Sequence, residues 1–375
     1  MNRIKNDNLR VATITYHKAY NYGSALQAYA LNHYLNKHGI NAEVINYHSS
    51  AQDDLYKMFE TPKSVMGLAR NLQSLLEYKN LKTHNKRFDQ FVKEYICLTE
   101  SEYTEKSDLS ELNDIYTHFI CGSDQIWNPN CADFTKAYLL DFVSNKSKCF
   151  SYAASMAIEK LPDEWENPFV DALKEFKMLS VRENQGKEYI QKLLDRDVEV
   201  VPDPVLLLTE EEWLNISAPT NIKGKYILCY FIGDVSGMRE FAKHMRKETG
   251  LQLVVIYKNI RDMLYRNKKY YSCGPREFIS LIKNCEYVCT NSFHAVLFSL
   301  MFKKNFWAFV DLNAGSAKSR LESILNLTGM QDRILCKNKL LPQTILEDID
   351  YSHIGDILTM LSDNGKNFLK KCLEE

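Results

Sequence analysis

Short apolar runs and amphipathic segments alternate along this chain. Residues 11–16 (VATITY) form an apolar run rich in β-branched side chains, and a segment of helical period follows from Gly23 to about His38. Gly39 comes directly after this segment, in the position of a residue that ends a helix. Residues 42–47 (AEVINY) form a second apolar run. The pattern predicts a strand, a helix and a second strand, which make one βαβ unit.

A second clear unit lies at residues 287–310. An apolar run at 287–289 ends in Thr-Asn-Ser, and an apolar segment of helical length, 293–302, leads into another run at 306–310. The helix is apolar nearly all round, so we expect it to be buried on several sides. His294 in its first turn breaks the pattern. An imidazole there could bind an anion or transfer a proton, and the alternative is a hydrogen-bonded histidine in an N-terminal turn.

The same order of elements recurs in both halves of the chain. Further strands are expected at 117–121, 150–153, 178–181 and 198–201 in the first half, and at 226–232 and 251–257 in the second. Strands that alternate with helices predict parallel sheets covered by helices on both faces. The predicted fold class is therefore α/β, with two Rossmann-like domains that face each other across a cleft. Ligands would bind at the carboxyl ends of the strands.

A chain of 375 residues exceeds one ordinary core, so two domains are expected. The expected division is an N-terminal domain at 1–208, a linker at 209–225, a C-terminal domain at 226–350 and a final helix at 351–375 that could pack back on the first domain. Within the first domain, residues 50–110 are polar and form a helical excursion. Their basic stretch at 79–87 (KNLKTHNKR) is either a solvated face or a patch that faces phospholipid headgroups or a lipid-linked substrate.

Composition narrows the classes of function. The net charge of −1 gives no overall field that would favour nucleic acid or an anionic membrane. The ten cysteines include no C-x-x-C pair, so neither a zinc site nor a redox dithiol is indicated. The first residues, MNRIKNDNLR, lack the apolar core of a signal peptide, and no apolar run reaches the roughly 18 residues of a membrane span. We therefore expect a cytoplasmic protein.

Polar residues gather where the predicted strands end. They are Asn21 and Tyr22 after the first strand, Asp124, Gln125 and Trp127 after 117–121, Arg182 after 178–181, Asn291, Ser292 and His294 after 287–289, and Arg320 in the following segment. Singly, a strand-end Asp is more often a helix cap and a lone Arg more often an ion-pair partner. Their shared position at the rim of two sheets favours a functional site. No spacing typical of a metal site, a dinucleotide fingerprint, a nucleophile elbow or a Walker A loop occurs.

Six motifs carry a family resemblance. They are N-Y-G-S-x-L-Q-A-Y-A-L (21–31), F-I-C-G-S-D-Q-I-W-N (119–128), S-Y-A-A-S (151–155), L-S-V-R-E (179–183), V-P-D-P-V-L-L-L (201–208) and T-N-S-F-H-A (290–295). Together they resemble the polysaccharide pyruvyl transferase family, follow that family's order and cover nearly the whole chain. The most specific are N-Y-G-x-x-L-Q and G-S-D-Q-x-W.

The resemblance implies a GT-B-like pair of domains and a reaction. A pyruvyl group would pass from phosphoenolpyruvate, a co-substrate, to two hydroxyls of a sugar, giving a cyclic ketal and phosphate without a metal or other cofactor. The acceptor would be a sugar of a cell-surface polysaccharide or of its lipid-linked precursor. An acceptor on a lipid carrier would explain peripheral contact of residues 50–110 with the inner face of the membrane.

The resemblance also assigns roles on the donor side. His294 matches the family's histidine and would act as the acid that protonates the donor's methylene carbon. Arg182 matches the arginine of the S-x-R-[DE] motif and would clamp the donor's anionic groups, with Asn291 nearby. Ser292 stands where arginine is common in the family, so either Arg320 supplies the second clamp from the next loop or the donor differs from phosphoenolpyruvate.

On the acceptor side, Asp124 is the candidate that assists the attacking hydroxyl. Asn21, Tyr22, Gln125 and Trp127 would line the acceptor site. Two alternatives keep the scaffold and change the function. One is a glycosyltransferase that uses a nucleotide sugar, with a base pocket around Gly233 and residues 258–275. The other is a non-catalytic protein that binds a glycan or a nucleotide.

Overall fold

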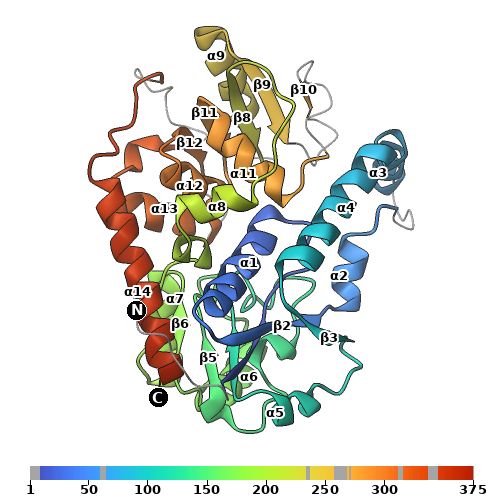
Figure 1. Ribbon diagram of the computed structural model, residues 1–375, viewed down its shortest axis with the longest axis vertical. Helices are drawn as coiled ribbons and strands as arrows, with labels where there is room; N and C mark the ends of the chain where they lie inside the picture. The colour runs from blue at the N-terminus through green and yellow to red at the C-terminus, as the bar shows by residue number, and fades with distance from the viewer. Residues whose placement is uncertain are drawn as a thin grey trace. The chain divides into compact units, whose positions relative to one another are not determined.

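The computed structural model describes residues 9–59, 65–233, 237–256, 268–269, 272–310, 316–336 and 345–374. The chain divides into two compact units, each built on its own sheet (Figure 1). Unit 1 comprises Met1–Tyr56, Asp89–Leu208 and Thr359–Glu375. Unit 2 comprises Lys57–Phe88 and Thr209–Leu358.

Unit 1 contains five parallel strands in the order β3-β2-β1-β4-β5. They are β1 (Arg10–Ile14), β2 (Asn41–Tyr47), β3 (Leu98–Tyr103), β4 (His118–Cys121) and β5 (Cys149–Ser151). In the central strand, Val11 pairs with Ala42 on one side and with His118 on the other. β1 is buried from Val11 onward because it has a neighbouring strand on each side and lies inside a layered core.

Helices join these strands. They are α1 (Tyr22–Lys37), α2 (Ser50–Leu55), α5 (Leu112–Ile115), α6 (Asp163–Leu173) and α7 (Asn184–Leu194). Beyond β5, the short strands β6 (Ser180–Val181) and β7 (Glu199–Val200) pair in parallel with each other. Two isolated parallel bridges, Phe150 with Met178 and Ala154 with Val181, connect this region to β5 and the segment that follows it.

Unit 2 contains six parallel strands in the order β10-β9-β8-β11-β12-β13. They are β8 (Tyr226–Tyr230), β9 (Gln252–Ile256), β10 (Lys268–Lys269), β11 (Tyr287–Thr290), β12 (Asn305–Phe309) and β13 (Ile334–Leu335). Its helices are α3 (Val65–Leu76), α8 (Glu210–Ile216), α9 (Met238–Thr249), α11 (Pro275–Asn284), α12 (Phe293–Met301) and α13 (Ser316–Leu327). The chain passes between the units after Tyr56 and after Leu208, and also within α4 (Tyr78–Tyr95) and α14 (Ile354–Glu374).

The predicted fold class is confirmed, because both sheets are parallel and strands alternate with helices in both units. The strand β3 was not predicted. Its sequence, LTESEY, is polar, and its three middle residues are exposed, as an edge strand permits. The observed division also differs in detail from the expected one. Residues 57–88 of the helical excursion group with unit 2, and residues 359–375 group with unit 1.

The last helix approaches unit 1 closely along its C-terminal half (Figure 1). The Asn364 side chain donates a hydrogen bond to the Val200 carbonyl at 2.9 Å, and the Phe368 ring lies 6.2 Å from that of Tyr152. A Cβ on Gly365 would overlap the buried Tyr152 hydroxyl oxygen and press on Leu207. Glycine is needed here because a side chain has no room. Among the described residues, no helix combines the length and apolar character that a membrane crossing requires.

We predict that Gly365→Ala lowers the free energy of unfolding by about 1–3 kcal/mol, because overpacking against Tyr152 outweighs the gain in helix propensity. Gly355→Ala in the same helix is the matched control, since a Cβ there meets nothing within 4 Å. The control should be neutral or more stable by up to about 1 kcal/mol. Urea unfolding of both variants measures the difference, and equal effects would contradict the close packing of Gly365.

Candidate functional site

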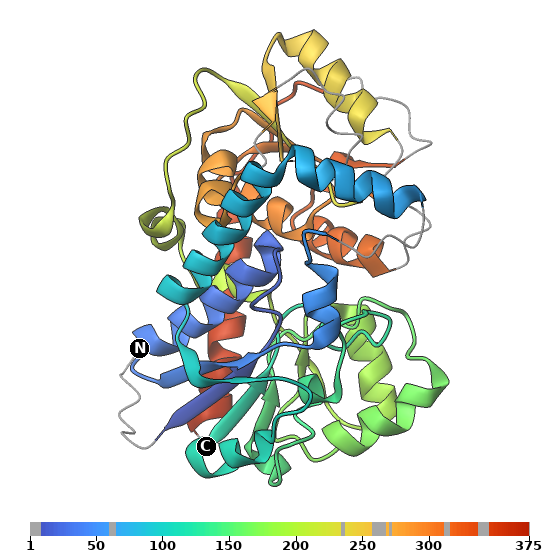
Figure 2. The same ribbon diagram turned by 90° about the vertical axis from the view of Figure 1, so that its right-hand side faces the viewer.

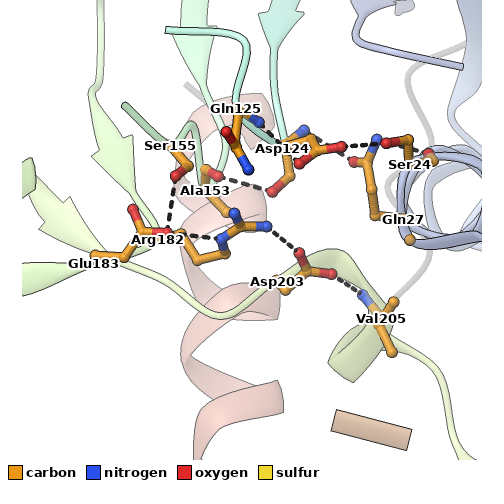
Figure 3. A network of polar contacts seen from close by, with 12 residues as sticks. Ser24, Gln27, Asp124, Gln125, Ala153, Ser155, Arg182, Glu183, Asp203 and Val205 are labelled. Carbon is orange, nitrogen blue, oxygen red and sulfur yellow. Dashed lines mark hydrogen bonds and ion pairs between the residues drawn. The ribbon is translucent and has the colours of Figure 1, made fainter. Parts of the chain in front are cut away.

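The candidate site of unit 1 is centred on Asp124, just beyond the carboxyl end of β4. The chain leaves the strand through Gly122, whose φ of 127° and tight approach to the Tyr152 backbone admit only glycine. Asp124 follows with a φ of 76°, a conformation that aspartate tolerates better than most residues. Its carbonyl accepts a hydrogen bond from the Ser155 N–H at 2.9 Å. This turn directs the Asp124 carboxylate toward the start of α1 (Figure 3).

Two motifs that are distant in the sequence meet at this turn. The Ser24 hydroxyl, in the first turn of α1, donates a hydrogen bond to one Asp124 carboxylate oxygen, and the Gln125 N–H donates to the other at 2.9 Å. Gln27, one turn later, accepts from the Ser123 N–H at 3.1 Å and donates to the Thr15 hydroxyl at 2.9 Å. The N-Y-G-S-x-L-Q and G-S-D-Q segments therefore hold each other in place.

Arg182 forms a buried ion cluster beside Asp124 (Figure 3). Its Nε donates to Glu183 at 2.9 Å and its Nη1 to Asp203 at 2.7 Å, and its side chain is 2% exposed. Burial opposes the charged form, but Glu183, Asp203 and Asp124 together raise the pKa of the Arg182 guanidinium well above its ordinary value. The Ser155 hydroxyl also donates to Glu183 at 2.9 Å. The S-Y-A-A-S, V-R-E and P-D-P motifs therefore meet at one buried cation.

This environment changes the role expected for Arg182. Two of its nitrogens are bonded to carboxylates, and three acidic side chains surround one guanidinium. An anionic donor would approach a group of net negative charge there. The contacts support a positioning role for Arg182, which holds the loops after β5 and β7, and provide no support for the donor clamp.

A cluster of tyrosines around Asp133 adjoins Asp124. The Tyr138 ring lies 4.7 Å from that of Tyr16, which follows β1, and 5.7 Å from that of Tyr47, at the end of β2. Burial raises the pKa of the Asp133 carboxyl and the charge of Asp124 adds to the effect, while the Asp133 backbone and the Tyr16 hydroxyl lower it. The Tyr138 hydroxyl is buried and has no hydrogen-bond partner among the described residues. The three rings belong to the hydrophobic core, whereas the carboxylates of Asp124 and Asp133 beside them keep some exposure and can accept hydrogen bonds from a sugar.

Sequence reasoning missed Asp133. It lies in the stretch C-A-D-F-T-K-A-Y, where one acidic residue next to aromatic residues is the only signal that the sequence offers. Asp133 is 8% exposed, which is unusual for an aspartate, and it interacts with Tyr16 and Asp124, which follow two separate strands. These residues come together only in the folded protein, so no pattern along the sequence predicts that they are neighbours.

The residues predicted to line the acceptor site differ in their burial and in their contacts. Asn21 caps α1, and its side chain accepts a hydrogen bond from the Gly23 N–H at 3.0 Å. Gln125 is half-buried beside Asp124. Tyr22 and Trp127 are 1% and 0% exposed, and the Trp127 ring contacts that of Phe169 in the core. Both aromatic side chains are therefore core residues, which corrects the expectation that they line a binding surface.

The residues predicted to bind the donor lie in unit 2. The Asn291 side chain accepts from the Ile232 N–H and donates to the Ile232 carbonyl, both at 2.7 Å, and so joins the ends of β11 and β8. Ser292 caps α12 by accepting from the Ala295 N–H at 3.4 Å. His294 follows in the first turn and is 7% exposed. Arg320 is half-buried on α13.

In the described part of the chain, no three or more His, Cys, Asp or Glu side chains lie where they could hold a metal ion. The loop that a nucleotide-sugar enzyme would need, 258–275, falls mostly outside the described residues.

Comparisons with known proteins identify a family and a fold. The model of the family described as polysaccharide pyruvyl transferase matches residues 21–311. No curated protein matches the chain. UDP-N-acetylglucosamine 2-epimerase from Rickettsia bellii has a TM-score of 0.50 at 8% identity, covering 98% of this chain and 97% of that one. UDP-GlcNAc 2-epimerase from Methanocaldococcus jannaschii has a TM-score of 0.45 at 15% identity, covering 94% and 99%. At this identity the first likeness shows the fold alone, which is GT-B-like.

We predict that Arg182→Ala lowers the free energy of unfolding by about 3–5 kcal/mol, because it leaves buried carboxylates without their cation. Urea unfolding measures the effect. Lys174→Ala is the control, since Lys174 forms only an exposed ion pair with Asp171 and should change stability by less than about 1 kcal/mol. A stable Arg182→Ala protein that has lost only donor binding would restore the clamp interpretation.

Asp133→Asn should become more stable relative to the wild type as the pH rises. The folded wild type binds this proton more tightly than the unfolded chain, so its free energy of unfolding falls as the pH rises above the ordinary value of 3.8 and through the raised pKa. Each pKa unit of difference is worth about 1.4 kcal/mol. Urea unfolding of both proteins across this pH range measures the difference in their free energies of unfolding, in which the contributions of the other titrating groups cancel. A stability difference that is independent of pH would contradict a raised pKa at Asp133.

Proposed function

Because the chain belongs to the polysaccharide pyruvyl transferase family, we propose that it transfers a pyruvyl group from phosphoenolpyruvate to two hydroxyls of a sugar. The methylene carbon of the donor gains a proton, both sugar oxygens bond to the adjacent carbon, and the bond from that carbon to the phosphate oxygen breaks. Of the two hydroxyl protons released, one balances the proton gained by carbon and the other leaves with phosphate. The acceptor is a sugar of a cell-surface polysaccharide or of its lipid-linked precursor.

The Asp124 carboxylate is the observation that carries the acceptor half of this proposal. Each of its oxygens accepts one hydrogen bond, from Ser24 and from the Gln125 N–H, which leaves lone pairs that can accept from a sugar hydroxyl. Its orientation is fixed by α1 and by the turn after β4, as a general base requires. The Asp133 carboxylate beside it, 8% exposed, provides a further polar group for the sugar.

Asp133 suits proton transfer to or from the acceptor. Burial raises the pKa of its carboxyl toward the working range of an acid–base group. In this proposal Asp124 orients and deprotonates one attacking hydroxyl, and Asp133 accepts the proton of the second hydroxyl.

The donor half of the proposal uses unit 2. His294 lies in the first turn of α12, where backbone N–H groups and the helix dipole favour an anion. The Ser292 hydroxyl oxygen accepts a hydrogen bond from the Ala295 N–H, so its hydrogen can still form a hydrogen bond to an oxygen of phosphoenolpyruvate. A neutral hydroxyl thus stands where the family resemblance leads one to expect an arginine, and in this proposal Arg320 supplies charge from α13. Asn291 holds the loop in which these groups lie.

Donor binding is the decisive measurement. Phosphoenolpyruvate at a hundredfold excess over its Kd should stabilise the protein by about 2.7 kcal/mol, measured as a shift in chemical or thermal unfolding. UDP-N-acetylglucosamine is the comparison ligand. A shift with the nucleotide sugar and none with phosphoenolpyruvate would replace this proposal with a nucleotide-sugar glycosyltransferase.

His294→Gln should reduce phosphate release from phosphoenolpyruvate by about 10²–10⁴-fold in the presence of an acceptor glycan, because the general acid is lost. His244→Gln is the matched control, since His244 lies on α9 of the same unit with a partly exposed side chain. The control should retain wild-type turnover. Undiminished turnover in His294→Gln would show that His294 is not the general acid and has only a structural role at the start of the helix.

A further inference from the structure

Helix α3 presents four leucines to solvent on one face. Leu68, Leu72, Leu75 and Leu76 are 58%, 58%, 64% and 69% exposed. Their spacing of four, three and one residues places them on one side of a helix. Single exposed leucines are ordinary, but four in a continuous stripe mark a surface that binds something. We call these four residues the leucine stripe.

The apolar surface extends beyond α3. Tyr78, at the start of α4, is 41% exposed, and its ring stacks on that of Phe59, which is 44% exposed, with centroids 6.4 Å apart. Tyr78 follows the leucine stripe directly in the chain, and its stacking on Phe59 brings a second ring beside it. Aromatic rings next to exposed leucines are typical of helices that lie in a membrane interface.

The leucine stripe is not a core face that lost its partner, because the segment is already anchored elsewhere. The Arg87 Nη1 donates to the Ser272 carbonyl at 2.6 Å, and its Nε forms an ion pair with Glu277 at 3.3 Å. His84 and Phe88 on the same part of α4 are buried. The inward face of α4 is thus packed, and α3 is carried by an anchored helix (Figure 2).

Basic side chains lie along the same segment as this apolar surface. Among the described side chains of the 57–88 segment, the exposed cations are Lys57, Lys79, Lys82 and Lys86. The acidic side chain described there, Glu77, is half-buried and accepts a hydrogen bond from Asn80. The Lys82 ammonium lies 6.0 Å from the centre of the Tyr78 ring, so cation and ring share one face. The surface therefore combines apolar area with positive charge.

We propose that α3 and the start of α4 dock on an anionic phospholipid bilayer. The leucine stripe enters the boundary between headgroups and acyl chains, and the lysines contact lipid phosphates. A second copy of the chain fits less well. In a two-fold contact the same lysines would face each other, and the charge that suits an anionic bilayer would oppose the dimer.

The docking proposal rests on this surface alone and is independent of the donor. Flotation of the full chain with vesicles tests it. The protein should bind mixed phosphatidylcholine and phosphatidylglycerol vesicles, and less to pure phosphatidylcholine, with weaker binding as salt rises. The double variant Leu72→Asp, Leu75→Asp should lose at least about tenfold in affinity for the mixed vesicles.

Leu327→Asp is the matched control, since Leu327 on α13 is 49% exposed in the same unit, and it should bind vesicles like the wild type. Circular dichroism and the unfolding shift with phosphoenolpyruvate show whether the double variant stays folded and donor-competent. Equal vesicle binding by the double variant, or no preference for phosphatidylglycerol, would overturn the proposal. So would a wild-type dimer in sedimentation that the double variant dissociates, with no binding to vesicles.

Discussion

The buried guanidinium of Arg182 is the interaction on which the candidate site of unit 1 depends. A guanidinium can be buried because carboxylates surround it, and carboxylates can be buried because the guanidinium neutralises them. Glu183 and Asp203 come from different loops, and Asp124 lies close enough to raise the pKa of Arg182 further. One ion cluster therefore joins the segments after β6 and β7, and Asp124 after β4 interacts with it electrostatically.

The electrostatics around the candidate residues differ between the two units, as the proposed acceptor and donor halves require. Acidic groups predominate around Asp124 and Asp133, which favours a neutral, hydroxyl-rich ligand over a multiply charged anion. The first turn of α12 in unit 2 has the opposite character, with a helix N-terminus, His294 and a serine cap. The proposed acceptor and donor halves follow from this difference in electrostatics, and each half can be tested by a variant in its own unit.

Several residues that looked functional serve the architecture. Trp127 and Tyr22 fill the core, Asn21 caps α1, and Asn291 binds the backbone of Ile232. Polar and aromatic groups at strand ends can meet two demands, because a loop that positions a catalytic group must first satisfy its own backbone and side chains. Some residues of the family motifs therefore stabilise the fold and do not contact a ligand themselves.

The sequence by itself determined the alternation of strands and helices, the two parallel sheets and the positions of Asp124 and His294 at the ends of their strands. Those features follow from local periodicity, which reports how each segment prefers to be buried. Only the tertiary structure decided the partners of Arg182, the burial of Asp133 among tyrosines, the edge strand β3 and the exposed leucine stripe of α3. These depend on contacts between segments far apart in the chain, and a buried leucine and an exposed one produce the same helical pattern.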